Sequence, residues 1–475
     1  FLWYTIVMET KRTKVPKASP VGLPQLDRFL RRFAHLFRRG TTWRKLERYV
    51  TGLLTDLRRK NCDTIADAVA GTSSQQLQHL LTDAKWDSAA LDQERVSQLA
   101  EISPPDGVLL VDDTGLGKKG TSSVGVHRQY SGTLGAIGNC QVVVSTEYLA
   151  DELTSTQPLH WPVNARLYLP EAWMEDDERR RKAHVPKDMT LKRKWEIAID
   201  LIDQAREWHV PYRHVVADAA YGDSHDFLTA LEERQISYVC GVERQFGVRL
   251  PHEVQEAKTA PLPEYKGVGR RRTVQRLAPL HQVGAVVQRI PEEAWRTITW
   301  RQGTKGPLRK QFAAVRVHHA RGNPEFGRSI GSWRASTGPE GWLLAERPLP
   351  GDEGDAKWYI SNLPADTPLE RLVALAHARW PMEQFYEDGK GECGLDDYQG
   401  RSWHGLHRHL ALVMLTYSFL AHERMAAPQD GGDAFSPLCA SPELPGRAPA
   451  SAALAAVRSH LMDHRHEPTR SHAPS

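Results

Sequence analysis

Apolar and polar positions recur with two different periods along this chain, and the change of period divides it into segments. From residue 23 to about residue 102 apolar residues return every three or four positions, as at Leu26, Phe29 and Leu30, which predicts amphipathic helices. Residues 66–77 read as a helix, a glycine turn and a Ser/Thr-capped helix. That order is typical of a helix-turn-helix unit and equally of any pair of antiparallel helices.

Short apolar runs after Pro104-Pro105 predict buried strands. The predicted strands cover residues 108–111, 123–130, 141–146, 165–169 and 214–217. Helices are predicted over residues 192–208 and 224–234. Successive strands followed by a helix, a strand and a helix are the order of a ribonuclease-H-like α/β core, a mixed sheet flanked by helices.

A period of two replaces this pattern between about residues 246 and 364, with alternating segments at 297–300, 312–317, 342–345 and 358–360. We interpret this region as a β-rich insertion that interrupts the α/β core. Helices are predicted again from residue 368 to residue 425. The last 50 residues are rich in Ala, Pro, Gly and Ser and predict a tail with one helix at 451–462.

The net charge of +4 is modest, but basic residues are concentrated near the start of the chain. Residues 25–60 hold 11 Lys and Arg against 3 Asp and Glu, a local excess of 8. Such a cluster fits either DNA phosphates or an ordinary solvated helix face. The arginines expected to contact phosphate are Arg31, Arg32, Arg38 and Arg39.

Cysteine usage and hydropathy indicate a cytoplasmic protein without a membrane anchor. The five cysteines are scattered and form no C-x-x-C pair, which argues against a disulfide framework and a zinc ribbon. The apolar runs are too short to span a bilayer. Residues 1–8 have neither the basic segment nor the cleavage site of a signal peptide, and Met8 is a candidate start.

Acidic residues at the ends of predicted strands are the strongest chemical signal. Asp113 follows the run 107–111, and Asp218 follows the run 214–217. Carboxylates that leave strand ends gather at the edge of an open α/β sheet, where ligand sites form. Glu383 adds a third acid. Such a set suits Mg²⁺, which prefers oxygen ligands, and two such ions cleave phosphodiesters.

The segment around Glu383 carries two cations at a regular spacing. Arg379, Glu383 and Lys390 fall within about 40° of arc on a helix, so they share one strip. Pro381 either kinks this helix or starts a new one, with Arg379 just before it. Asp112 competes with Asp113 for the first acidic position, because strand alternation sends the two side chains to opposite faces.

These motifs resemble those of DDE-type insertion-sequence transposases. The spacing R-x3-E-x6-K at Arg379, Glu383 and Lys390 is similar to their Y-R-E-K signature, although Ala376 stands where the signature has Tyr. An Asp directly before Thr matches the family's first acid and selects Asp113. The resemblance implies catalytic and metal-ligating roles for Asp113, Asp218 and Glu383.

The resemblance also implies two Mg²⁺ ions, for which Mn²⁺ substitutes, and double-stranded DNA as partner. The protein would bind the inverted repeats that end its element, cleave there and transfer the 3′-OH strands to target DNA as a homodimer. The expected phosphate-binding cations outside the basic cluster are Arg379, Lys390 and Arg401, together with Lys118 and Lys119, which lie in a glycine-containing hairpin turn at 115–120. Trp300 would either belong to the core or stack on a base flipped out of the DNA.

This interpretation predicts six segments. They are a basic arm (1–22), a helical DNA-binding domain (23–103), the first part of the catalytic core (104–245), the β-rich insertion (246–365), the C-terminal core helices (366–425) and a mostly disordered tail (426–475). Two alternatives remain. A haloacid-dehalogenase-type phosphatase would need Asp-x-Asp, but position 115 is Gly. A catalytically silent, transposase-derived DNA-binding protein would keep the fold without the reaction.

Overall fold

The computed structural model describes residues 17–18, 23–132, 135–153, 155, 158–262, 264, 275–303, 306–321 and 336–426. Most of the predicted arm and the tail beyond residue 426, with its helix at 451–462, lie outside these residues. Within them, no helix is long and apolar enough to cross a membrane.

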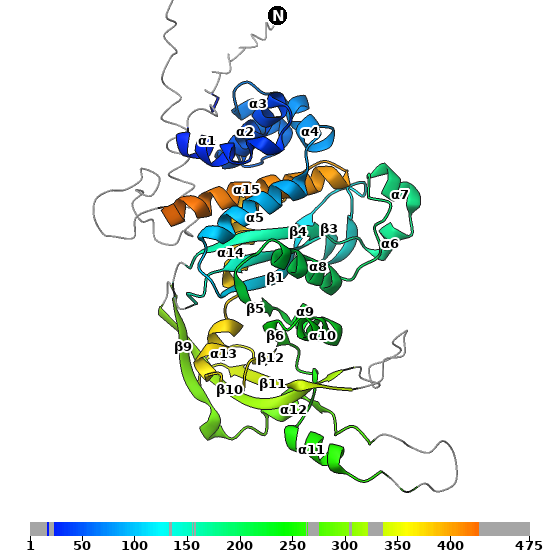
Figure 1. Ribbon diagram of the computed structural model, residues 1–475, viewed down its shortest axis with the longest axis vertical. Coiled ribbons are helices and arrows are strands. Elements are labelled where there is room, and N and C mark those ends of the chain that lie inside the picture. Colours follow the sequence, from blue (N-terminus) through cyan, green and yellow to red (C-terminus); the bar gives the residue numbers. More distant parts are fainter. Residues whose placement is uncertain are drawn as a thin grey trace, which may run out of the picture.

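Between residues 23 and 102 the chain forms five helices, of which α2, α4 and α5 pack on the long C-terminal helix α15 (Trp403–Ala426) (Figure 1). They are α1 (Pro24–Arg31), α2 (Gly40–Leu54), α3 (Cys62–Ala68), α4 (Ser74–Thr82) and α5 (Ser88–Ile102), with a short 3-10 turn at Ala34–Leu36. Asn61 and Ser73 cap α3 and α4 through their side chains. Gly71 takes a φ of +69° in the turn between them, a conformation that glycine adopts without strain.

The described residues form one mixed sheet of 12 strands. Its strands are β1 (Gly107–Gly117), β2 (His127–Ser131), β3 (Ala136–Leu149), β4 (His160–Leu167), β5 (Tyr212–Ala217), β6 (Ser237–Val242), β7 (Gly247–Arg249), β8 (His281–Gln282), β9 (Arg296–Gly303), β10 (Gly306–Arg321), β11 (Ser336–Arg347) and β12 (Lys357–Ser361). The order is β2-β3-β1-β5-β6-β12-β11-β10-β7-β8, with β4 beside β3 and β9 beside β10. β1, β5 and β6 run parallel, and the other pairs are antiparallel.

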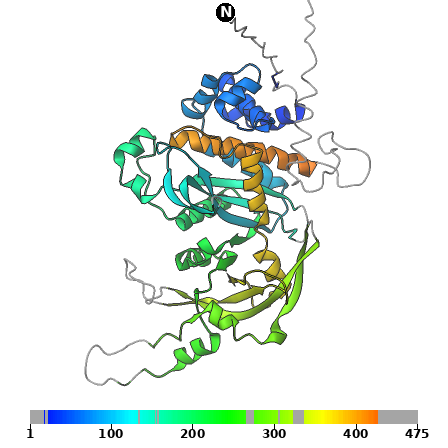
Figure 2. The same cartoon turned by 180° about the vertical axis from the view of Figure 1, so that it is seen from behind.

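Helices cover both faces of the core strands, which explains why β1 is apolar on both sides. Leu109 and Val111 of β1 pack in a cluster with α8 (Lys194–Glu207) and α10 (His225–Glu233). Val108 and Leu110 pack in a second cluster with α14 (Trp380–Gly391) and α15. Figure 2 shows α14 crossing the sheet on the face opposite α8.

The residues interpreted above as an insertion continue the core sheet, because β12 pairs with β6, and β11, β10 and β7 follow outward. It also contains helices that the period-two pattern did not predict. These are α11 (Pro251–Thr259), α12 (Val283–Val287) and a 3-10 turn at Glu292–Ala294. The strand predicted at 123–130 is wrong in its first half, since β2 begins at His127. The proposed segment boundaries stay predictions.

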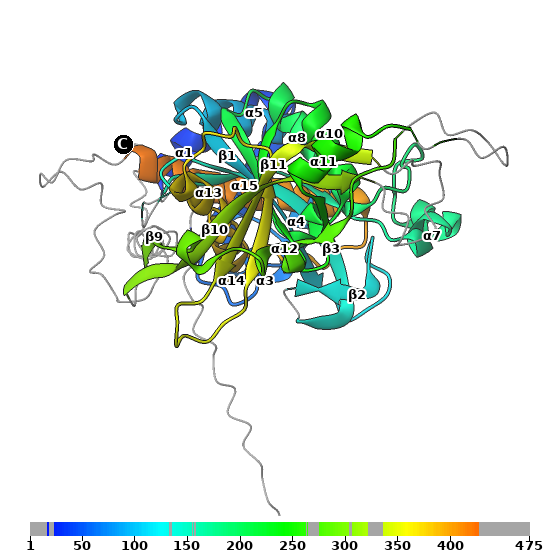
Figure 3. The same ribbon diagram turned by 90° about the horizontal axis from the view of Figure 1, so that it is seen from below.

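Smaller helices lie between the main elements. They are α6 (Glu171–Met174), α7 (Asp177–Lys182), α9 (Ala219–Gly222) and α13 (Leu369–Ala376). Seen from below, α7 stands out at one side of the molecule and β9 lies at the other (Figure 3).

Candidate active site

β1 carries two adjacent aspartates toward opposite faces of the sheet. The strand is longer than the predicted 108–111 and continues through both aspartates to Gly117, with Asp112 opposite Ser145 and Asp113 opposite Val144 of β3. Because successive side chains of a strand alternate, only one of the two can face α14. The contacts of each aspartate identify which one it is.

Asp112 and Asp218 share the guanidinium group of Arg379. Nη2 of Arg379 lies 2.6 Å from Oδ2 of Asp112 and 3.9 Å from Oδ2 of Asp218. Asp218 directly follows β5 and caps α9, its Oδ1 accepting the backbone N–H of Ala220 at 3.0 Å. Arg379 is the residue before α14, and Pro381 lies in the first turn of that helix. Strand end, helix cap and helix start thus meet around one cation.

Asp113 lies on the other face and has different partners. Nζ of Lys194, in the first turn of α8, is 3.0 Å from its Oδ2, and the hydroxyl of Tyr221 donates to the same oxygen at 3.3 Å. The structure therefore places Asp112, and not the Asp113 selected by the motif, beside Arg379 and Asp218. The motif alone did not reveal on which face of β1 the helix with Glu383 packs.

Glu383 lines a cleft together with Asp218 and Arg379. The cleft has a volume of about 410 Å³, and its opposite wall comes from the insertion, through Trp358 and Tyr359 of β12. Glu383 lies in the first turn of α14, four residues after Arg379. Asp218 after β5 and Glu383 on α14 thus line one space, to which residues of β12 also contribute.

The electrostatics of the cleft follow from burial. Burial raises the pKa of Asp112 to about 6 despite the neighbouring guanidinium, and the carboxylate of Asp218 adds to the increase. Burial alone would lower the pKa of Arg379, but Asp112 and Asp218 hold it above its ordinary value, with a smaller effect of Glu383. The buried carboxylates of Asp112 and Asp218 are therefore stabilised in their charged form by a cation, here the guanidinium of Arg379.

A comparison with known families connects this geometry to a reaction. The profile described as DDE superfamily endonuclease matches residues 32–307, more than half of the chain. The chain belongs to the DDE superfamily endonucleases. The match contains Asp112, Asp113 and Asp218 and ends before α14, so Glu383 lies outside it.

A curated relative agrees with this family. The probable transposase for insertion sequence element IS701 from Microchaete diplosiphon is 25% identical over 237 residues, which are 50% of this chain and 58% of that protein. This chain thus spans a little over half the length of the relative it matches. Membership of the DDE endonucleases also removes the phosphatase alternative, whose motif already failed at Gly115.

DDE endonucleases typically use divalent metal ions, and the donor chemistry here suits them. Asp112, Asp218 and Glu383 offer only carboxylate oxygens, the ligand type that Mg²⁺ prefers. Among the described residues, however, no three or more His, Cys, Asp or Glu side chains converge closely enough to form a metal-binding group. The guanidinium of Arg379 lies against two of these carboxylates instead. The residue types therefore fit a metal ion. In this structure the guanidinium of Arg379 neutralises the charge of Asp112 and Asp218.

The remaining cations predicted near the site have different positions. Nζ of Lys390 donates to Oγ1 of Thr114 at 2.6 Å, which fastens the C-terminal half of α14 to the Asp112 face of β1. Lys118 donates to the backbone carbonyls of Asp396 and Tyr398, so its ammonium holds a loop, and its contact with phosphate stays a prediction. Lys119 and Arg401 are exposed.

Trp300 belongs to a packed cluster, which favours the core interpretation over base stacking. Its ring stacks on His377 at a centroid distance of 4.0 Å and meets Phe312 edge-on. Other aromatic residues line the cleft, namely Trp358, Tyr359 and Trp380. The guanidinium of Arg301 lies 4.0 Å from the ring centre of Trp380, which brings an insertion cation next to α14.

Sequence reasoning missed several residues around the site. They are Lys194, Tyr221, Arg301, Glu346, His377 and Trp380. Lys194 had a usable signal, because it begins a predicted helix in the basic run 192–194. Glu346 had none, since its contacts with Lys310 and His377 bring together residues from separate elements.

The basic cluster of the N-terminal helices is largely open to solvent. Arg32, Arg38 and Arg39 are exposed, whereas Arg31 pairs with Asp27 one helical turn away at 2.9 Å. The cluster thus presents cations at the surface, and its contact with DNA stays a prediction.

Proposed function

We propose that this DDE endonuclease is a DNA transposase with a ribonuclease-H-like core. It would bind the terminal inverted repeats of its mobile element, cleave there, and join the freed 3′-OH strands to target DNA. Membership of the family and the likeness to a probable insertion-sequence transposase support this function. The observation that carries the site is the position of Arg379 between Asp112 and Asp218, beside the cleft with Glu383.

The proposed metal-holding acids are Asp112, Asp218 and Glu383, with Asp112 in place of Asp113. Asp112 shares a face with α14, whereas Asp113 is engaged by Lys194 and Tyr221 across the sheet. Two Mg²⁺ ions, or Mn²⁺ in their place, would supply activation of a water and stabilisation of the leaving 3′ oxygen.

Arg379 would have two successive roles. Without DNA, its guanidinium balances the buried charge of Asp112 and Asp218. Its Nε is buried and has no hydrogen-bond partner among the described residues, so the group retains a donor. A planar guanidinium binds phosphate oxygens well, and because the Arg379 side chain keeps 24% of its surface exposed, its outer N–H groups would hold the phosphate to be cleaved. Lys390 would keep α14 in register with β1 through Thr114.

The N-terminal helices would hold the inverted repeat through the exposed arginines of the basic cluster. Joining two element ends in one reaction requires two active sites, so we propose a homodimer in the DNA complex. The described residues of α3 and α4 have the order of a helix-turn-helix, with Gly71 in the turn. The exposed face of α4 would then enter the major groove.

The decisive experiment compares Asp112→Asn with Asp113→Asn. Each variant is incubated with duplexes that contain the element's own ends, with Mg²⁺ or Mn²⁺, and the strand breaks are mapped. Binding to the same duplexes is measured in parallel. We expect Asp112→Asn to bind the ends and not cleave them, and Asp113→Asn to keep measurable cleavage.

The reverse result would assign the first acidic position to Asp113. A parent protein that binds the ends and cleaves them with neither metal would be a silent, transposase-derived DNA-binding protein. Asp218→Asn serves as the reference for a lost acid, because its position after β5 does not depend on the choice within β1.

A further inference from the structure

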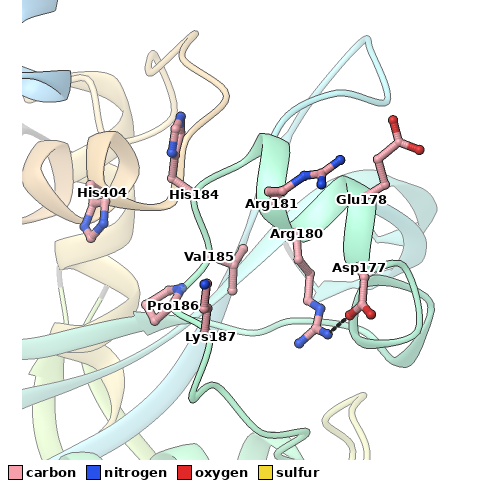
Figure 4. Close-up of a pocket in the computed structure, with 9 residues that line it drawn as sticks. All are labelled: Asp177, Glu178, Arg180, Arg181, His184, Val185, Pro186, Lys187 and His404. Atoms are coloured by element: carbon pink, nitrogen blue, oxygen red, sulfur yellow. Dashed lines mark hydrogen bonds and ion pairs between the residues drawn. The ribbon is translucent and has the colours of Figure 1, made fainter.

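A second cleft lies away from the candidate active site, between α7 and the start of α15. It has a volume of about 820 Å³, and Figure 4 shows its lining. Five of the lining side chains are basic or imidazole groups, namely Arg180, Arg181, His184, Lys187 and His404. None of the proposed catalytic acids contributes to it.

The acids of this cleft are already neutralised by neighbours. Asp177 pairs with Arg180, as the dashed line in Figure 4 marks, and Glu178 pairs with Lys182 at 2.6 Å. Arg181 and Lys187 are exposed and have no ion-pair partner among the described residues. Arg181 also acts electrostatically on Glu178, whose ion pair is with Lys182, so an anion in the cleft would meet exposed cations on both of its sides. The exposed rings of His184 and His404 add hydrogen-bonding groups beside them.

The walls of the cleft are fixed by long-range contacts. Nη2 of Arg179 donates to the carbonyl of Thr121 at 2.7 Å, and its guanidinium lies 3.8 Å from the ring centre of Trp173. The backbone N–H of Trp403 donates to the carbonyl of Ala183 at 2.8 Å, which ties the start of α15 to the end of α7. The cations are thus held on a built surface.

The chain itself links this cleft to β1, the strand that also carries Asp112 on its other face. Lys187 lines the cleft, and Lys194 touches Asp113, the neighbour of Asp112 on β1. The seven residues from one lysine to the other can span at most about 25 Å. Phosphates of B-form DNA follow one another by about 3.4 Å along the axis of each strand. The cleft is therefore within about seven base pairs of β1, and the connecting segment 187–194 is itself basic.

We propose that this cleft, defined by Arg181, His184, Lys187 and His404, binds backbone phosphates of duplex DNA within about seven base pairs of the bond that is cleaved. The inference rests on the proposed function, because it needs DNA at the Asp112 site. A phosphate there would be contacted without reading its base, so the cleft would position the duplex and leave its sequence free. Element ends and target DNA offer the same phosphates.

The test uses the full chain and the double variant Arg181→Gln/Lys187→Gln. Its matched control is Lys258→Gln/Arg289→Gln, which removes the same charge from exposed residues of the insertion. Affinity is measured at several salt concentrations on three duplexes. One ends at the cleavage position, one extends about fifteen base pairs beyond it, and one is a target duplex without an element end.

On the long end duplex we expect the cleft variant to bind about tenfold more weakly than the control. Its plot of log affinity against log salt concentration should be shallower by about 2, since each lost phosphate contact removes about 0.9 from the slope. On the short duplex the two variants should agree. Arg181→Lys/Lys187→Arg keeps both charges and should bind like the parent, which separates charge from folding. A loss on the target duplex alone would assign the cleft to target DNA and also support a phosphate site.

The inference would be overturned if the cleft variant and the control had the same salt dependence of affinity on the long end duplex and on the target duplex. An equal loss on the short and long end duplexes would also overturn it, because the contact would then not lie beyond the cleavage position. A parent protein that binds none of the three duplexes would refute the proposed function itself, and the inference with it.

Discussion

Replacing Glu346 with Gln should loosen the junction between the insertion and α14. Glu346 lies on β11 with its side chain fully buried, next to Nζ of Lys310 and 3.0 Å from Nε2 of His377. The hydroxyl of Tyr359 donates to it at 3.1 Å. His377 in turn stacks on Trp300 and precedes Arg379 by two residues. One carboxylate thus joins three insertion strands to the segment that positions the proposed active site.

The size of the effect follows from the shifted pKa of Glu346. Burial would raise this pKa, but His377 and Lys310 more than offset it and lower it from 4.5 to about 2. A shift of this size corresponds to about 3 kcal/mol of stability. Because the folded pKa is depressed, the stabilisation is present above the unfolded value of 4.5 and is lost as the pH falls toward 2. At about pH 3.5, roughly 2 kcal/mol should remain.

The free energy of unfolding of the parent and of Glu346→Gln is measured by urea denaturation at neutral pH and at about pH 3.5, with tryptophan fluorescence as the signal. Glu340→Gln on the same strand is the matched control, because Glu340 pairs with Arg316 at the surface and should change stability by at most about 1 kcal/mol. Hydrogen exchange of residues 369–391 should rise in Glu346→Gln, and cleavage should fall while DNA binding persists. Equal stability of Glu346→Gln and the parent at neutral pH, or a difference that does not shrink on acidification, would refute this reasoning.

Three further changes test other parts of the molecule. Glu383→Gln should keep end binding within about threefold and lose cleavage, because metal-site charge serves the reaction more than the grip on DNA; retained cleavage would remove Glu383 from the site. In a second variant, four exposed arginines of the basic cluster are replaced together by Gln, namely Arg31, Arg32, Arg38 and Arg39. Its salt dependence of DNA binding should be shallower by up to about 3.6, and an unchanged slope would make the cluster a solvated face. Arg95→Met should lower the free energy of unfolding by about 3–5 kcal/mol, since fully buried Arg95 donates to the carbonyl of Val163 at 2.7 Å and pairs with Asp92 at 2.9 Å; a smaller loss in urea denaturation would contradict that role.

Several predictions from local sequence agree with the structure, whereas the choice between Asp112 and Asp113 depended on packing and does not. The apolar runs located β1 and β5, and the position of Asp218 after β5 followed from them. Pro381 identified the start of α14, one of the two possibilities it offered. Alternation along β1 showed that Asp112 and Asp113 face apart, but the face toward α14 is decided by a helix more than 260 residues later in the chain.

The same limit applies to single side chains. Lys118 looked like a phosphate ligand because it follows a strand in a glycine-rich loop, yet the carbonyls that hold its ammonium come from residues 396 and 398. Trp300 could not be assigned from period two, because both a packed and an exposed indole fit a strand. Its partner His377 lies in another element and was not visible in the pattern.

The pairing of β6 with β12 has a consequence for how this protein tolerates change. The chain leaves the core at Val242 and returns at Trp358, and these two residues stand opposite each other in adjacent antiparallel strands. Everything between them is, in connectivity, one long hairpin whose base is already closed. The entropic cost of bringing the two ends of a segment together rises only slowly with the length of the segment, so residues could be added or removed between β6 and β12 at little cost. Changes in the length of the segment between β6 and β12 would leave the pairing of β1, β5 and β6 intact. The wall of the cleft could therefore vary while the strands that hold the acidic residues stay the same.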